Sequence, residues 1–177
     1  MAVVIANYIK NNAKKTKAAK ANIRYIEHRP GKDGERLWRT LFGSDGRMSR
    51  QQAYEMIDNA EPGSIFWRIK ISPDPKIEDV HRDLSMQEVI ERMMNTLQAQ
   101  LGKQISWIAA IHADHSPHRH VHALATLPKL SRQEFERLPE VLIHGATEIC
   151  CEQRRELDLV REHKEREREG EEWERER

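Results

Sequence analysis

The sequence predicts an α+β domain with a central antiparallel β-sheet, flanking helices and a charged C-terminal helix. Three observations support this class. Apolar and polar residues alternate at 64–71 and 120–125, and a run at 105–111 is apolar except for one Ser, which together predict strands. Longer segments with apolar residues at helical spacing lie between these strands. The last segment, KEREREGEEWERER, alternates charges as a solvated helix or a frayed tail does.

The spacing predicts the elements in a definite order. We expect a strand at 2–9, a helix at 13–27, loops up to residue 48, a helix at 50–59, a strand at 64–71, a helix within 81–104, a β-hairpin at 105–127, a helix from residue 132 and another from about 147. Ser49 and Ser131 are the expected N-caps of two of these helices. Leu37, Trp38, Leu41 and Phe42 form an apolar cluster that either packs on the core or contacts a ligand.

Length and composition describe one domain with a polar extension. The chain has 177 residues, 38% of them hydrophobic and 33% charged. No segment approaches the roughly 18 apolar residues of a membrane span, and the N-terminal apolar run is too short for a signal peptide. The adjacent Cys150 and Cys151 cannot staple the fold and fit a reducing compartment. We therefore expect a cytoplasmic protein with no membrane segment.

Charge is distributed unevenly, although the net charge is only +1. Residues 1–50 hold twelve Lys or Arg and four Asp or Glu, whereas residues 152–177 hold eight and eleven. Such a clustered basic segment is an electrostatic footprint for phosphates.

Histidines gather in the central hairpin, where five of the nine fall between His112 and His122. Strand alternation places His118, His120 and His122 on one face, and an antiparallel partner brings His112 alongside them. A five-residue loop sets His112 opposite His118, and a longer loop sets it opposite His120. Converging imidazoles can bind a divalent metal at about 2.0–2.2 Å and leave a position open for substrate.

The alternative for this segment is a histidine-rich loop that only titrates or binds metal adventitiously. The buried first strand and the alternation in the second favour the metal site. Asp114 can accept a hydrogen bond from a ligand histidine and so set its tautomer.

Tyr25 lies on the last turn of the first predicted helix, beside Arg24. Alone it would be a core aromatic; it becomes a candidate nucleophile when a metal site elsewhere in the fold activates a phosphate for it. Tyr8 and Tyr54 compete for this role, but packing explains both.

Four segments together resemble the relaxases of plasmid mobilisation and conjugation, close to the type that processes T-DNA borders. They are ANIRYIEHRPG, the strand RIKISPDP, the helix after it, and IAAIHADHSPHRHVHALAT. Relaxases belong to the His-hydrophobe-His endonucleases. The similarity covers roughly residues 10–130, and it implies a relaxase-like nuclease domain at 1–150 with a charged helical tail at 151–177.

The resemblance assigns roles to five residues. Tyr25 matches the nucleophile, His112 and Asp114 match a His-x-Asp element, and His120 and His122 match the His-x-His ligand pair. Matching the pair to His118 and His120 instead is the alternative. Ligand softness favours Mn, Zn, Ni or Co for three imidazoles, whereas the resemblance implies a loosely selective divalent ion such as Mg or Mn.

The activity implied is metal-dependent, site-specific nicking of single-stranded DNA at a transfer origin, with strand transfer through a 5′-phosphotyrosine. Accessory DNA-binding proteins are candidate partners. The basic side chains expected on the DNA backbone are Lys14, Lys17, Lys20, Arg24 and Arg29, unless they form an ordinary solvated helix face. A non-nicking accessory protein and a metal-dependent hydrolase that uses water are the other functions considered.

Overall fold

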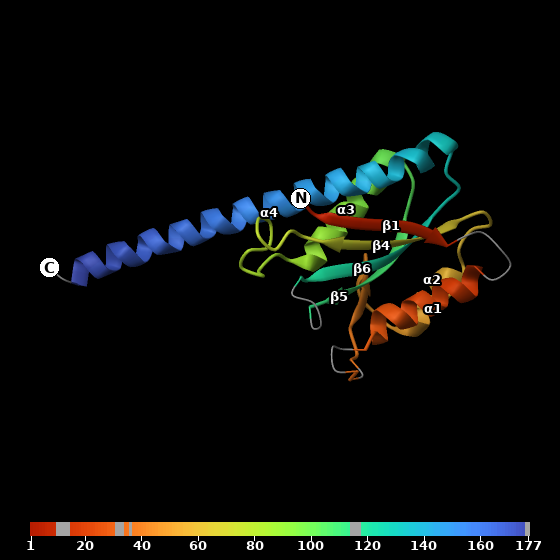
Figure 1. Ribbon diagram of the computed structural model, residues 1–177, viewed down its shortest axis with the longest axis horizontal. Helices are drawn as coiled ribbons and strands as arrows, with labels where there is room; N and C mark the ends of the chain where they lie inside the picture. Colours follow the sequence, from red (N-terminus) through yellow and green to blue (C-terminus); the bar gives the residue numbers. More distant parts are fainter. Residues whose placement is uncertain (10–14, 31–33, 36, 114–117, 176–177) are drawn as a thin grey trace.

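The computed structural model describes residues 1–9, 15–30, 34–35, 37–113 and 118–175, with side chains to residue 173. Four helices and a six-stranded sheet make up this part of the chain (Figure 1). In chain order the elements are β1 (Val3–Ile9), α1 (Lys15–His28), β2 (Leu41–Gly43), β3 (Gly46–Met48), α2 (Arg50–Asp58), β4 (Ile65–Ser72), α3 (Met86–Leu101), β5 (Ser106–His112), β6 (His120–Leu127) and α4 (Arg132–Arg175).

The sheet is open and antiparallel, with strand order β1-β4-β6-β5-β2-β3. The predicted α+β class is therefore confirmed. The histidine hairpin β5–β6 lies in the middle of the sheet, with β4 and β1 on one side and the short β2 and β3 on the other.

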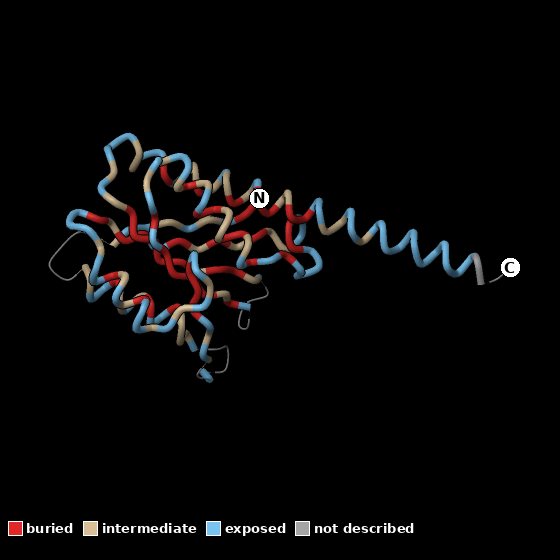
Figure 2. Tube along the Cα trace, turned by 180° about the vertical axis from the view of Figure 1, so that it is seen from behind, coloured by how far each residue is buried: buried red, intermediate tan, exposed pale blue. Residues whose placement is uncertain are grey.

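Each face of the sheet is covered by its own pair of helices (Figures 1 and 2). On one face α1 and α2 pack against Phe66, Ile108 and Leu124. On the other face α3 and α4 pack against a larger cluster that includes Trp67 and Val121. Alternate residues of β4, β5 and β6 thus enter two separate cores, as the period of two requires.

Capping residues begin two helices as expected. The Ser49 hydroxyl accepts from the Gln52 amide at 3.2 Å, and the Gln52 side chain accepts from the Ser49 amide at 2.8 Å. Ser131 forms the same reciprocal arrangement with Glu134 at the start of α4. Both are capping boxes, which satisfy amide groups that have no partner inside the helix.

The segment expected to be loop up to residue 48 contains the hairpin β2–β3, so that expectation was wrong. Each strand has only three residues, too few for an alternation to register. Gly43 and Gly46 make the hairpin feasible. A Cβ on Gly43 would lie 2.8 Å from the Trp107 carbonyl oxygen, and Gly46 has φ near +94°.

The two helices expected after the histidine hairpin are one, α4, with 44 residues. Pro139 removes one amide donor, but Leu138, Leu142 and Ala146 are buried on both sides of it. Packing of these side chains therefore keeps the helix continuous across Pro139. Beyond about residue 155 the helix projects from the sheet and is mostly exposed (Figure 2).

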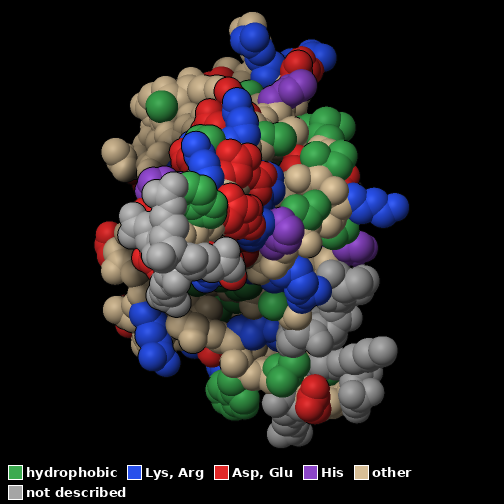
Figure 3. All heavy atoms as spheres, turned by 90° about the vertical axis from the view of Figure 1, so that its left-hand side faces the viewer, with side chains coloured by type: hydrophobic (Ala, Val, Ile, Leu, Met, Phe, Trp, Pro, Cys, Tyr) green, Lys and Arg blue, Asp and Glu red, His purple; other side chains and the backbone are tan. Residues whose placement is uncertain are grey.

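The projecting end of α4 is mixed in charge. Figure 3 views the molecule from the side on which α4 projects, and acidic and basic side chains are interspersed in the upper part of this view. Cys150 and Cys151 lie on α4, buried and half-buried. Among the described residues, no helix combines the length and apolar character that a bilayer crossing needs.

Candidate metal centre and active site

The hairpin register brings three histidines onto one face of the sheet. His112 pairs with His120, and His122 lies between Ala110 of β5 and Lys70 of β4. Residues opposite each other in a sheet point to the same side. The three side chains therefore share the face that α1 covers.

The ring nitrogens of His112, His120 and His122 converge. One potential ligand atom of each lies within 4.8 Å of the other two, and this is the only such group of three or more among the described residues. The ring centroids are 4.6–5.3 Å apart. His118 precedes β6 and stays outside the group. The loop is thus the longer of the two that the sequence allowed.

Backbone carbonyls orient two of these rings. His112 Nε2 lies 2.7 Å from the Ile26 carbonyl oxygen of α1, and His120 Nδ1 lies 3.1 Å from that of His118. We assign the N–H to these two nitrogens, because a carbonyl can only accept. In each neutral ring the other nitrogen then carries the lone pair, as ligand histidines require.

His122 supplies the clearest test of a metal fit. Its Nε2 is buried and has no hydrogen-bond partner among the described residues. Burial of a polar nitrogen without a partner is costly, and metal coordination would satisfy it. Burial, followed by the neighbouring His112 and His120, lowers the pKa of His122 to about 3. The ring is therefore neutral near pH 7, the form that binds metal.

Tyr25 lies beside this cluster because α1 is docked by its apolar side. Ile23 and Ile26 are buried against the sheet, which leaves Tyr25 at the margin of the packed surface with 47% exposure. The Tyr25 ring meets the His122 ring edge to face, with centroids 6.1 Å apart. The Arg29 guanidinium lies 5.7 Å from the centre of the same phenol ring.

A groove of about 630 Å³ runs between α1 and strands β1 and β4, and Tyr25 and His122 both line it. Among the residues that the structure describes, three cationic ones line it: Arg29, Arg68 and Lys70. Burial, together with the charge of Arg29, lowers the pKa of Lys70. A bound anion would relieve this concentration of positive charge.

The predicted basic residues divide between two sides of α1. Arg29 lines the groove, whereas Lys20 and Arg24 face α2. Lys20 pairs with Asp58 at 2.6 Å, and Arg24 donates to the Tyr54 hydroxyl at 3.1 Å. Lys17 is exposed on α1. The predicted Lys14 and Asp114 lie outside the described residues.

The sequence prediction did not include two of the cationic residues that line the groove, Arg68 and Lys70. The signal was present: the alternation that predicted their strand put both on the side opposite Trp67 and Ile69. What was not visible is that β4 pairs with β6, which sets Lys70 beside His122.

An ion pair that sequence reasoning also missed holds the start of β6. Arg119 lies between His118 and His120 and donates two hydrogen bonds, at 2.9 and 2.6 Å, to the Asp79 carboxylate. The Asp79 side chain is 4% exposed and that of Arg119 16%. The pair ties β6, the strand that bears His120 and His122, to the segment between β4 and α3.

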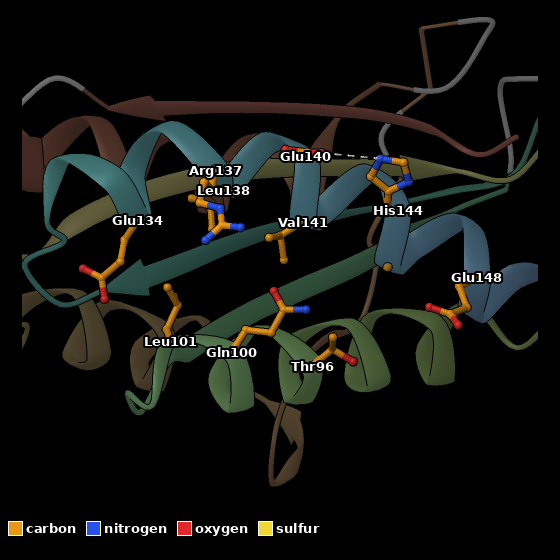
Figure 4. Close-up of a pocket in the computed structure, with 11 residues that line it drawn as sticks. Thr96, Gln100, Leu101, Glu134, Arg137, Leu138, Glu140, Val141, His144 and Glu148 are labelled. Atoms are coloured by element: carbon orange, nitrogen blue, oxygen red, sulfur yellow. Dashed lines mark ion pairs between the residues drawn. The ribbon is translucent and has the colours of Figure 1, made fainter.

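A second cavity, of about 360 Å³, lies on the other face of the sheet between α3 and α4 (Figure 4). Glu134, Glu140 and Glu148 line it from α4, and Thr96 and Gln100 from α3. Arg137 and His144 of α4 also line it, so the cavity wall is mixed in charge, and the sheet separates it from the histidine cluster.

No protein-family model, curated protein or solved structure matches this chain.

Proposed function

We propose that this chain is a DNA relaxase, a metal-dependent enzyme that nicks single-stranded DNA and transfers the strand through a 5′-phosphotyrosine. In this proposal it acts in plasmid mobilisation or conjugative transfer. The observation that supports it best is the position of Tyr25, whose ring contacts His122 at the edge of the three-histidine cluster. A phenol, three imidazoles and a cationic groove together suit phosphodiester chemistry.

The groove cations would bind the substrate. Arg29, Arg68 and Lys70 would neutralise the phosphodiester backbone and direct one phosphate toward Tyr25. The Arg29 guanidinium, 5.7 Å from the centre of the phenol ring, would stabilise negative charge that develops on the phenol.

The chemical step then exchanges one phosphoester bond for another. A bond forms between Tyr25 Oη and phosphorus, and the bond from phosphorus to the 3′ oxygen breaks. The phenol proton leaves, with Asp114 its expected acceptor, and the 3′ oxygen gains a proton. Because a phosphoester is conserved, the 3′ hydroxyl of a strand can reverse the step and restore the backbone.

His112, His120 and His122 would hold a divalent ion. When bound, it would supply Lewis-acid stabilisation of a non-bridging phosphate oxygen. The carbonyls of Ile26 and His118 would keep two of the three imidazoles in the orientation that ligation needs.

The test is a covalent adduct. Single-stranded oligonucleotides of random sequence, labelled at the 3′ end, are incubated with the full chain and Mn²⁺ or Mg²⁺. We expect a labelled, SDS-stable protein band in wild type and none with Tyr25→Phe, because only the phenol oxygen can form the bond. Tyr54→Phe is the matched control and should keep the adduct, since Tyr54 lies on α2 and contacts Arg24.

Each of the other outcomes would indicate a different function for the chain. Cleaved DNA ending in a free 5′-phosphate, with no adduct, would identify a hydrolase that uses water. DNA binding without cleavage would identify an accessory module. An adduct that survives Tyr25→Phe would move the nucleophile to another tyrosine.

A further inference from the structure

Two adjoining cavities lie near the C-terminal end of α1, where Glu27 lines the larger one. They measure about 540 and 290 Å³ and share Arg39, Thr40 and Arg47 in their walls. We call them the arginine cleft; Trp38 and Arg50 line its larger part. The larger cavity falls within the range of about 300–1,000 Å³ that small ligands occupy.

Trp38 is held in the wall of this cleft without being buried. Trp38 as a whole is 74% exposed, whereas Trp67 and Trp107 are core residues. The indole meets the His28 ring edge to face, with centroids 4.0 Å apart, and the Arg50 guanidinium lies 5.8 Å from its centre. An exposed aromatic ring held beside guanidinium groups is the arrangement on which unpaired nucleobases stack.

The charge of the cleft suits a phosphate. Three arginines line it, and the one acidic residue among its described lining residues is Glu27. Glu27 accepts a hydrogen bond from Arg50 Nε at 2.5 Å. Arg39 and Arg47 place two further guanidinium groups in the rest of the wall.

The cleft lies next to the proposed active site. Arg39 Nη1 donates to the Arg29 carbonyl at 2.9 Å, and Arg29 lines the Tyr25 groove. Ile111, which lines the smaller cavity, adjoins His112 in β5 but points to the opposite face of the sheet, toward α3. A strand that leaves the groove past Arg29, at the end of α1, would meet Arg39 in the wall of the cleft.

We infer that the arginine cleft is a subsite for single-stranded DNA, in which one nucleobase stacks on Trp38 and an adjacent phosphate lies between Arg39 and Arg47. This inference rests on the proposed function for the identity of the ligand. It adds a binding site for nucleotides that flank the reacting phosphate.

Binding is measured with uncut DNA, using the full chain with Tyr25→Phe and a fluorescein-labelled single-stranded oligonucleotide. We expect Trp38→Ala in this background to weaken binding about tenfold, the effect of losing one stacked base. Trp38→Phe should restore most of it. Trp173→Ala is the matched control, because Trp173 is 60% exposed near the far end of α4, and its affinity should be unchanged.

Arg47→Gln supplies an independent variant. We expect weaker binding and a slope of log Kd against log salt reduced by about one, as for one lost phosphate contact. Arg132→Gln, at a 92% exposed arginine on α4, should leave both unchanged.

The inference is overturned if Trp38→Ala binds DNA as tightly as Trp173→Ala, or if the Tyr25→Phe parent binds no single-stranded DNA. Adduct formation separates this failure from that of the nuclease. An adduct with no role for Trp38 removes the subsite alone, and Trp38-dependent binding with no adduct removes the nuclease alone.

Discussion

His122 illustrates how much of this site depends on single atoms. Its Nε2 is buried without a hydrogen-bond partner among the described residues, and the sheet register sets its ring beside Lys70. The carbonyls of Ile26 and His118 select the tautomers of the other two histidines. These contacts, more than the residue types alone, make the three imidazoles suitable ligands.

Asp79 lies outside the histidine cluster but should influence it through Arg119, the neighbour of His120. Asp79→Asn removes the charge that Arg119 pairs with, and we expect a loss of about 3 kcal/mol in the free energy of unfolding. This is near the low end for a broken buried pair, because Arg119 keeps some contact with water. Urea unfolding measures it. Metal affinity should fall as well, since Arg119 adjoins His120.

Asp58→Asn is the matched control for this prediction. Asp58 also pairs with a cation, Lys20, but its side chain is 49% exposed. Exposed pairs contribute about 0–1 kcal/mol, so little change is expected. Equal losses from the two variants would contradict a special role for the Asp79 pair.

At the scale of elements, α4 depends on its first turn. Glu134 accepts from Lys103 Nζ and from the Ser131 amide, and these contacts lower its pKa to about 2. The carboxyl pKa is about 4.5 in the unfolded chain and lower in the folded one. The contacts therefore stabilise the fold fully above about pH 4.5, and this stability is lost as the pH falls toward 2. We expect the free energy of unfolding, measured with urea from about pH 7 to pH 2, to fall less steeply with decreasing pH in Glu134→Gln than in the wild type. An unchanged pH dependence of the unfolding free energy would show that the contact adds no stability.

Helix α4 also tests where the domain ends. The predicted boundary at 150/151 falls inside the helix, and Gln153 and Arg154 beyond it are buried. Arg154 and Arg161 both pair with Asp83. We expect a chain ending after residue 163 to unfold at the same urea concentration as the full chain, because the described side chains that it loses are exposed.

A chain ending after residue 150 should be clearly less stable, because it loses the buried Arg154 and its ion pair with Asp83. If this shorter chain matched the full one in urea unfolding, the boundary predicted from the sequence would hold.

At the scale of the whole molecule, the fold brings a helix from the front of the chain over a hairpin from its middle. A metal bound only by the folded form would stabilise it by about 2.7 kcal/mol at a hundred times Kd. We expect Mn²⁺, Co²⁺ or Zn²⁺ to raise the Tm of the wild type, and the increment to vanish in His120→Ala. His144→Ala, at an exposed histidine on α4, should keep it. An equal increment in both variants would place the metal elsewhere.

Local patterns predicted much of this fold. The alternation in 64–71 and 120–125 predicted two strands that the structure contains, and Ser49 and Ser131 marked two helix starts. The hairpin β2–β3 escaped prediction because three-residue strands carry no measurable period. The continuity of α4 past Pro139 escaped it because the packing that supports the helix there is not local.

The sequence by itself determined the α+β class, the histidine-rich hairpin and the face that His120 shares with His122, because strand alternation is a local property of the chain. Only the tertiary structure decided that His112 lies opposite His120, that Tyr25 contacts His122, and that Lys70 lines the same groove. These juxtapositions depend on loop length, sheet order and helix docking. Each is set by the packing of segments far apart in the sequence, which no local pattern records.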